Sequence, residues 1–137
     1  MKGGFIVAEK IKSWDELKAL RQKAQSDAIG TSGEWVVMVG MATCCAAAGA
    51  DQVLDAINDS VKQEGLTNVK VVLTGCYGNC YAEPVLEVRR GDQAMGTGTR
   101  YGYVDVARAK EIVDKHLKRG EIVEEALVGQ DQEVYIP

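Results

Sequence analysis

Apolar positions along the chain recur with two different periods, and the change from one to the other outlines the predicted elements. Residues 35–39 form a continuous apolar run, as expected for a strand that is covered on both faces. From Ala50 to Glu64 the apolar residues recur at helical spacing, and Gly65 ends this helix. Residues 69–73 return to a strand pattern. The pattern therefore predicts a strand–helix–strand unit.

A separate helix is predicted before this unit. Ser13 and Glu16 match a capping box, in which the Ser13 hydroxyl accepts the amide of Glu16 and the Glu16 carboxylate reaches back. A helix from about Trp14 to Gln25 is expected to follow. Residues 31–33 then interrupt the pattern before the first strand.

Two more strands and a helix are predicted in the second half of the chain. The alternation over residues 85–88 indicates a strand, and Gly91 marks a turn. Residues 94–103 contain three glycines and are expected to form an irregular strand. Asp105 is expected to cap a helix that runs to about Arg119.

This order of elements is typical of a small α/β layer arrangement. If the strands at 35–39 and 69–73 are parallel, the crossover between them brings the two segments that follow them to the same end of the sheet. The chain contains four cysteines, and all of them lie in those two segments, residues 41–49 and 74–80. The sequence therefore predicts that the cysteines converge on one site.

The two cysteine segments are predicted to be loops that leave room for a metal group. Small residues surround each thiol, so the backbone can approach an object larger than a side chain. Four thiolates are the usual protein ligands of an iron–sulfur cluster or a structural zinc ion. The candidate ligands are the four cysteines of the chain: Cys44, Cys45, Cys76 and Cys80.

Composition narrows the function classes. The net charge of −4 argues against nonspecific binding to nucleic acid or to an anionic membrane, and 6% aromatic residues suggest no stacking platform for bases. No window reaches the ~18 consecutive apolar residues of a membrane span. The sequence indicates a cytoplasmic protein, where closely spaced cysteines favour metal or redox chemistry over structural disulfides.

The cysteine pattern and the segments around it resemble those of a known family. Residues 75–80 follow a Gly-Cys-x-Gly-x-Cys pattern, Pro84 follows shortly after, Cys45 to Gly49 precede a helix, and 109–120 end a helix at a glycine. With these features the chain resembles the thioredoxin-like [2Fe–2S] ferredoxin family over roughly residues 35–127. Members occur as the small NADH dehydrogenase subunit of respiratory complex I and in NAD-linked hydrogenases and formate dehydrogenases.

The resemblance implies a thioredoxin-like α/β fold with an extra N-terminal helix, divided into an extension (1–33), a ferredoxin domain (34–127) and a tail (128–137). It implies a [2Fe–2S] cluster on the four cysteines and one-electron transfer within an NAD(P)H-linked complex, with no catalysis by this chain alone. The implied partner is a flavoprotein subunit that oxidises NAD(P)H, with room for other iron–sulfur subunits.

One position departs from the family pattern. Aligned on Cys45 and Gly49, a further cysteine is expected at Gly40, whereas this chain carries Cys44 instead. Side chains of adjacent residues diverge in an extended segment, so two neighbouring cysteines reach one cluster only if the backbone bends. Three outcomes are open: Cys44 replaces the missing ligand, three thiolates and a non-cysteine ligand hold the cluster, or the cluster is lost.

Other classes of function stay open beside this one: a thiol–disulfide oxidoreductase, a zinc-stabilised module and a structural subunit without a cluster. The oxidoreductase motif Cys-x-x-Cys is absent, since three residues separate Cys76 from Cys80. His116, the one histidine, is expected at the surface near a helix end rather than as a ligand. Residues 89–90, both arginine, are expected to be solvated, and Tyr77 and Tyr81 are expected to pack on the core.

Overall fold

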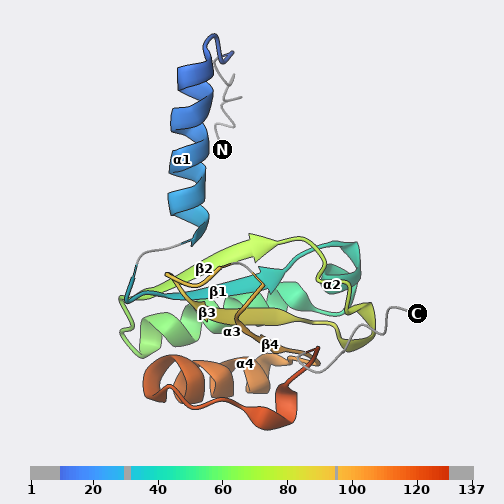
Figure 1. The fold of residues 1–137 in the computed structure, drawn as a ribbon. Helices are drawn as coiled ribbons and strands as arrows, with labels where there is room; N and C mark the ends of the chain where they lie inside the picture. The colour runs from blue at the N-terminus through green and yellow to red at the C-terminus, as the bar shows by residue number, and fades with distance from the viewer. Residues whose placement is uncertain (1–9, 30–31, 95, 130–137) are drawn as a thin grey trace, which may run out of the picture.

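The computed structural model describes residues 10–29, 32–94 and 96–129. Figure 1 shows one four-stranded sheet with helices packed against it and a single helix that stands apart. The elements follow one another in this order: α1 (Trp14–Ile29), β1 (Trp35–Gly40), α2 (Thr43–Ala47), α3 (Ala50–Gln63), β2 (Val69–Thr74), η1 (Cys80–Ala82), β3 (Leu86–Arg90), β4 (Thr99–Tyr101), α4 (Val106–Ile112), η2 (Val113–Lys118) and η3 (Glu124–Ala126). The predicted order of helices and strands is confirmed, and the short helices α2, η1 and η3 are additions to it.

The sheet has the strand order β2-β1-β3-β4. β1 and β2 are parallel, with Val37 opposite Val71, and the other two pairings are antiparallel. α3 makes the crossover between the parallel strands. Both cysteine segments therefore leave the sheet at the same end, where α2 and the loop after β2 lie side by side in Figure 1. The predicted strand–helix–strand unit is confirmed.

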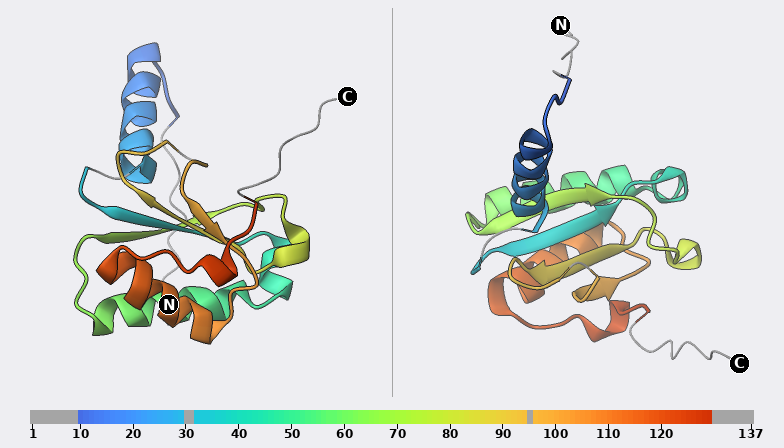
Figure 2. Two further views of the ribbon diagram at one scale, coloured as in Figure 1. Left: turned by 60° about the horizontal axis from the view of Figure 1, so that its bottom comes forward. Right: turned by 45° about the horizontal axis from the view of Figure 1, so that its top comes forward.

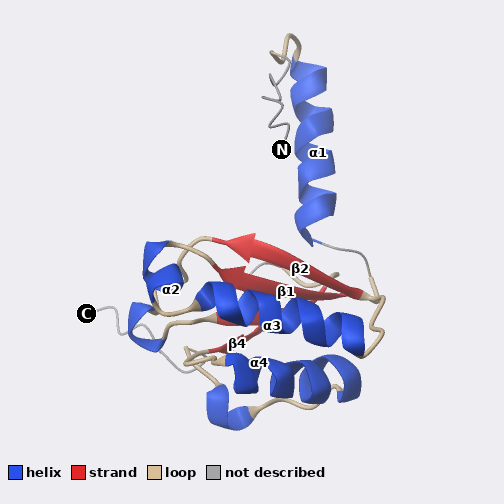
Figure 3. Ribbon diagram, turned by 180° about the vertical axis from the view of Figure 1, so that it is seen from behind, coloured by secondary structure: helices blue, strands red, loops and turns tan. Residues whose placement is uncertain are grey.

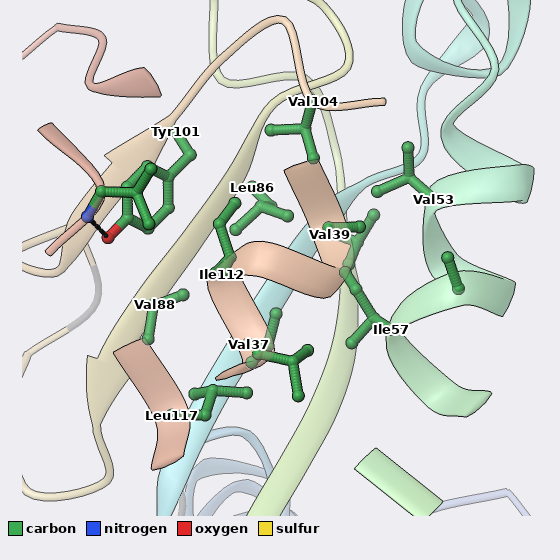
Figure 4. Close-up of a cluster of buried hydrophobic side chains, with 14 of the residues drawn as sticks. Val37, Val39, Val53, Ile57, Leu86, Val88, Tyr101, Val104, Ile112 and Leu117 are labelled. Atoms are coloured by element: carbon green, nitrogen blue, oxygen red, sulfur yellow. Dashed lines mark hydrogen bonds between the residues drawn. The ribbon is translucent and has the colours of Figure 1, made fainter. Parts of the chain in front are cut away.

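The hydrophobic core lies between the sheet and the two helices α3 and α4, which cover the same face of it (Figure 3). Alternate residues of β1 point towards these helices, as the period of two in a strand requires. Figure 4 shows this packing, and the hydrogen-bonded Tyr101 closes one side of it. The central residues of the cluster are Val37, Val39, Val53, Ile57, Leu86, Val88, Val104, Ile112 and Leu117.

The opposite face of the sheet is covered by the loop between β3 and β4. Glu87 is buried, and its carboxylate accepts the amides of Gly96 and Gly98 at 3.1 and 3.2 Å. A Cβ on Gly98 would lie 2.6 Å from the carbonyl oxygen of Val88, so only glycine allows this close approach. The predicted irregular strand over 94–103 is accordingly reduced to the three residues of β4.

The same loop corrects the prediction for residues 89–90. Arg89 is buried, and its guanidinium donates to the carbonyl oxygens of Arg90 and Gln93 at 3.2 and 2.9 Å. Arg90 is exposed, and its guanidinium carbon lies 3.5 Å from the centre of the Trp35 ring. The pair is therefore solvated at Arg90 alone, because Arg89 faces the folded-back loop.

The prediction of a surface histidine is wrong. His116 is buried in η2, where its Nδ1 lies 2.7 Å from the hydroxyl of Tyr101. The Tyr101 oxygen also accepts the amide of Val123 at 3.2 Å, so the hydroxyl links η2 to the segment that follows it. Burial, followed by the nearby charge of Arg90, lowers the pKa of His116 to about 4. The imidazole is a structural, neutral group.

α1 begins with the predicted capping box. The Ser13 hydroxyl accepts the amide of Glu16 at 3.2 Å, and the Glu16 carboxylate accepts the amide of Lys12 at 2.8 Å. The helix reaches Ile29, beyond the predicted end at Gln25. Figure 2 shows that it stands away from the sheet, and Trp14 is 68% exposed. Over the described ranges, no helix is long and apolar enough to cross a membrane.

The two ends of the chain are described only in part. Residues 1–9 of the expected extension and 130–137 of the expected tail lie outside the described residues. Val128, at the start of that tail, donates its amide to the carbonyl oxygen of Arg100 at 3.0 Å. Val128 therefore lies beside β4.

Candidate metal centre

The first cysteine segment is a short helix rather than the predicted loop. β1 ends at Gly40, and α2 occupies Thr43–Ala47 before α3 begins at Ala50. Gly49, between the two helices, has a φ of 94°, a left-handed conformation that glycine adopts without strain. Successive residues of a helix are rotated by about 100°, so adjacent side chains remain on neighbouring faces. The sulfur atoms of Cys44 and Cys45 are accordingly 3.8 Å apart.

The second cysteine segment is a loop that ends in the short helix η1. The sulfur atoms of Cys76 and Cys80 are 3.4 Å apart. Gly78, with a φ of 83°, turns the chain between them and donates its amide to the Cys76 sulfur at 3.3 Å. The glycine in the Gly-Cys-x-Gly-x-Cys pattern thus allows a backbone amide to face a sulfur atom.

The two segments meet at the end of the sheet. The Met41 amide donates to the carbonyl oxygen of Thr74 at 2.9 Å, and the sulfur atoms of Cys44 and Cys80 are 3.8 Å apart. All four cysteines are free thiols. Two thiolates on one tetrahedral metal, with metal–sulfur bonds of about 2.3 Å, lie roughly 3.8 Å apart. The structure therefore brings the four predicted residues together at distances that suit shared metal ions, and their role as ligands stays a prediction.

Glu83 is a fifth group at the site, and the sequence prediction missed it. Its Oε1 lies 3.9 Å from the sulfur of Cys44 and 3.7 Å from that of Cys76. The ligand atoms of Cys44, Cys45, Cys76 and Glu83 all lie within 4.8 Å of one another. An acidic residue three positions after Cys80 and directly before Pro84 was the available signal. Its significance depends on η1, which turns the chain back towards the thiols.

Burial and hydrogen bonding shift the pKa values of the thiols in different directions. Burial, with the hydrogen bond to Glu83 as the next cause, raises the pKa of Cys45 to about 12. Hydrogen bonds with Cys76 and Cys44 raise the pKa of Cys80 to about 11. Cys44 shifts in the other direction: hydrogen bonding from Cys76 is the largest effect that lowers its pKa. In the metal-free site, Cys44 therefore ionises before Cys45 and Cys80.

The departure at Gly40 has a spatial explanation. A Cβ built on Gly40 would lie 3.2 Å from the Cys45 sulfur and 3.2 Å from the carbonyl oxygen of Val85. The Cys45 side chain therefore lies against the place where a side chain at position 40 would begin. The helix of α2 brings Cys44 to the thiols of the second loop instead, and the bend that two adjacent cysteines need is present.

The two loop tyrosines differ from each other. The Tyr77 hydroxyl donates to the carbonyl oxygen of Met38 at 3.1 Å, and the Arg100 guanidinium carbon lies 4.7 Å from the centre of its ring. Burial raises the pKa of Tyr77. Tyr77 packs on the core as predicted. Tyr81 is 61% exposed, so the prediction is wrong for this residue.

Comparison with known proteins gives two curated relatives. The chain is 35% identical over 114 residues to the NADP-reducing hydrogenase subunit HndB of Solidesulfovibrio fructosivorans, a match that covers 83% of this chain and 88% of that protein. It is 32% identical over 88 residues to a protein of Aquifex aeolicus named "Ferredoxin, 2Fe-2S", covering 63% of this chain and 74% of the relative. No protein-family model matches the chain.

Solved structures show the same similarity. The wild-type thioredoxin-like [2Fe–2S] ferredoxin from Aquifex aeolicus superposes with a TM-score of 0.60 at 27% identity, over 71% of this chain and 98% of that one. A second structure of a thioredoxin-like [2Fe–2S] ferredoxin from the same organism gives a TM-score of 0.61 at 25% identity, over 76% of this chain. The fold is therefore that of these ferredoxins, with additional chain outside the shared part.

Proposed function

Because the chain belongs to the thioredoxin-like [2Fe–2S] ferredoxin family, we propose that it is an electron-transfer subunit with a [2Fe–2S] cluster in an NAD(P)H-linked oxidoreductase complex of the hydrogenase type. The proposed ligands are the four cysteines that converge at the end of the sheet: Cys44, Cys45, Cys76 and Cys80. That convergence from two separate segments is the observation that carries the proposal.

The donor set fits such a cluster in number, kind and surroundings. When bound, the cluster supplies one-electron redox chemistry, with a potential set by ligands, hydrogen bonds to sulfur and exposure. The four cysteines, as thiolates, would hold the iron. Gly78 donates its amide to the Cys76 sulfur, and this stabilises negative charge there. Cys45 is fully buried, so it excludes water from the inner side, whereas Cys76 and Cys80 are exposed on the outer side.

The partner proposed for this subunit is a flavoprotein that oxidises NAD(P)H, with other iron–sulfur subunits beyond it. The similarity to a hydrogenase subunit supports membership of a multi-subunit complex. Tyr81, which follows Cys80 in the chain, is 61% exposed. Tyr103, whose amide donates to the carbonyl oxygen of Ala82 in η1, is 65% exposed. Exposed aromatic residues are typical anchors of protein interfaces. The clustered free thiols favour the reducing cytoplasm as the location.

The test is the anaerobically purified protein itself. We expect a brown protein with absorption bands in the visible range and with iron and acid-labile sulfide in equal amounts. The double variant Cys76→Ser/Cys80→Ser is the control and is expected to be colourless with an unchanged far-ultraviolet circular dichroism spectrum. A colourless wild-type protein after careful anaerobic reconstitution with iron and sulfide would reject the proposal.

A zinc-stabilised module is the second candidate. The compact group of donors favours it, because four ligand atoms within 4.8 Å of one another suit a single tetrahedral ion. Metal analysis of the same preparation separates the two functions. Zinc in a 1:1 ratio to the chain, without sulfide and without colour, would identify this alternative.

The division of the chain into an extension (1–33), a ferredoxin domain (34–127) and a tail (128–137) is likewise a proposal. The separation of α1 from the sheet supports the first boundary (Figure 2). A chain that begins at residue 34 is expected to unfold cooperatively and to hold as much iron as the full chain. Loss of the cooperative transition would place part of the extension within the folded domain.

A further inference from the structure

Glu83 lies among the thiols although no thiol function requires a carboxylate there. Its Oε1 is almost equidistant from the sulfur atoms of Cys44 and Cys76, at 3.9 and 3.7 Å. An oxygen and a sulfur bound to one tetrahedral metal lie roughly 3.6 Å apart, so these distances are close to the spacing of two ligands. The carboxylate therefore occupies the position of a ligand atom rather than that of a distant neighbour.

The backbone holds this carboxylate in place. η1 ends at Ala82. The Ala82 amide donates to the carbonyl oxygen of Asn79, and the Ala82 carbonyl oxygen accepts the amide of Tyr103. The Oε2 atom of Glu83 accepts the amide of Val85 at 3.0 Å, so Oε1 is the oxygen left to face the thiols. One oxygen thus anchors the side chain while the other points into the site.

In the metal-free site the carboxylate accepts hydrogen bonds from the thiols that it faces. Cys44 and Cys76 donate to Oε1 of Glu83 at 3.9 and 3.7 Å. A bound metal would take the place of these thiol protons, and it attracts the carboxylate and the thiolates alike. Oε1 therefore faces the same space as the thiols, with or without a metal.

We propose that Glu83 is a fifth donor of the metal centre, with Oε1 able to bind iron in the position of Cys44 or Cys76 when that thiolate is removed. The inference rests on the proposed function, because it concerns the same cluster. The exchange replaces one anionic donor by another, so the charge of the site is unchanged and no electron is transferred. Carboxylate oxygen is an established ligand type for non-haem iron. Cys80 lies outside the group of ligand atoms that includes Oε1 of Glu83, so we do not expect Glu83 to replace the thiolate of Cys80.

The test uses three cysteine variants of the full chain, Cys44→Ala, Cys76→Ala and Cys80→Ala, each with and without Glu83→Gln. Glutamine keeps the shape of the side chain and an oxygen for the amide of Val85, but it is a poor iron ligand. We expect Cys44→Ala or Cys76→Ala to keep a cluster whose reduced form has electron paramagnetic resonance g-values shifted from those of the wild type. Adding Glu83→Gln should lower iron retention by about tenfold or more. Cys80→Ala should lose its iron in both backgrounds.

The control is Glu124→Gln, at an exposed glutamate of η3, which is introduced into the same cysteine variants and should leave their iron content unchanged. Circular dichroism of every variant checks that it folds. If Cys44→Ala and Cys76→Ala are both as empty as Cys80→Ala, the fifth-donor inference is wrong. The same holds if their iron content does not depend on Glu83. The proposed function is judged separately, by the wild type: a wild type with full iron beside three empty variants rejects only the role of Glu83.

Discussion

The two cysteine segments support their thiols in different ways. Cys44 and Cys45 lie on α2, between β1 and α3, and Cys45 is fully buried. Cys76 and Cys80 are exposed on a loop held by local hydrogen bonds, such as that of Gly78 to a sulfur atom. The first pair is thus positioned by the core, whereas the second pair depends on its own loop and on what the thiols bind. The following experiments test this difference in the metal-free protein.

Alkylation should give the largest difference. Cys44 has a lowered pKa, and burial raises that of Cys45 to about 12, so at pH 8 the two adjacent thiols differ in thiolate fraction by about 10³ or more. We expect iodoacetamide to modify Cys44 first and to leave Cys45 unmodified, as measured by mass spectrometry of peptides. In denaturant the two should react alike. Equal rates in the folded protein would mean that α2 opens freely and that the first segment is no better supported than the second.

Serine substitution should separate the two segments by stability. Cys45→Ser places a hydroxyl in a fully buried position and is expected to lower the free energy of unfolding by about 2 kcal/mol. Cys80→Ser, at an exposed position, should change it by less than about 0.5 kcal/mol. Urea denaturation of both variants provides the measurement. If Cys80→Ser lowers the free energy of unfolding as much as Cys45→Ser does, the two segments do not differ in how they support their thiols.

The glycines at the carboxyl ends of the two parallel strands, Gly40 in β1 and Gly75 after β2, offer a matched pair. Gly40→Ala brings a Cβ to 3.2 Å from the Cys45 sulfur, and overpacking of this kind should cost about 1–2 kcal/mol. A Cβ on Gly75 meets no atom within 4 Å, so Gly75→Ala should be neutral or slightly stabilising. Thermal unfolding of the two variants compares them directly. A destabilised Gly75→Ala variant would show that the second loop is packed as tightly as the first.

The smallest effect is expected at the tyrosines of the second loop. Tyr77→Phe removes the hydrogen bond to the carbonyl oxygen of Met38 and should cost about 1 kcal/mol. Tyr81→Phe, the exposed counterpart, should cost less than about 0.5 kcal/mol. Chemical denaturation resolves the two values. If both variants are as stable as the wild type, Tyr77 does not anchor the loop to β1.

The sequence predicts those features of the fold that depend on a few neighbouring residues. The apolar run of β1, the helical spacing of α3 and the Gly-Cys-x-Gly-x-Cys pattern each act over a few residues, so fold class and the four cysteines of the site could be predicted from them. The parallel crossover then places both segments at one end of the sheet.

The missed features depend on contacts between distant segments. Arg89 is buried because the loop after β3 folds back over it, and Glu83 reaches the thiols because η1 turns the chain. Small residues around cysteines suit a loop and a helix equally well, so the sequence does not distinguish α2 from a loop. The sequence pattern at each of these positions was compatible with both outcomes, so only the assembled fold distinguishes them.

The buried His116 makes folding of this domain sensitive to acid. Its imidazole is uncharged in the fold because burial and the nearby charge of Arg90 lower its pKa to about 4, below the value of 6.5 for an exposed histidine. Between these values the unfolded chain binds a proton that the folded chain does not, so acid shifts the equilibrium towards unfolding. Stability is therefore complete above pH 6.5 and declines as the pH falls towards 4, by up to roughly 3 kcal/mol. The histidine of η2 thus limits how acidic a compartment the domain tolerates, whatever its thiols bind.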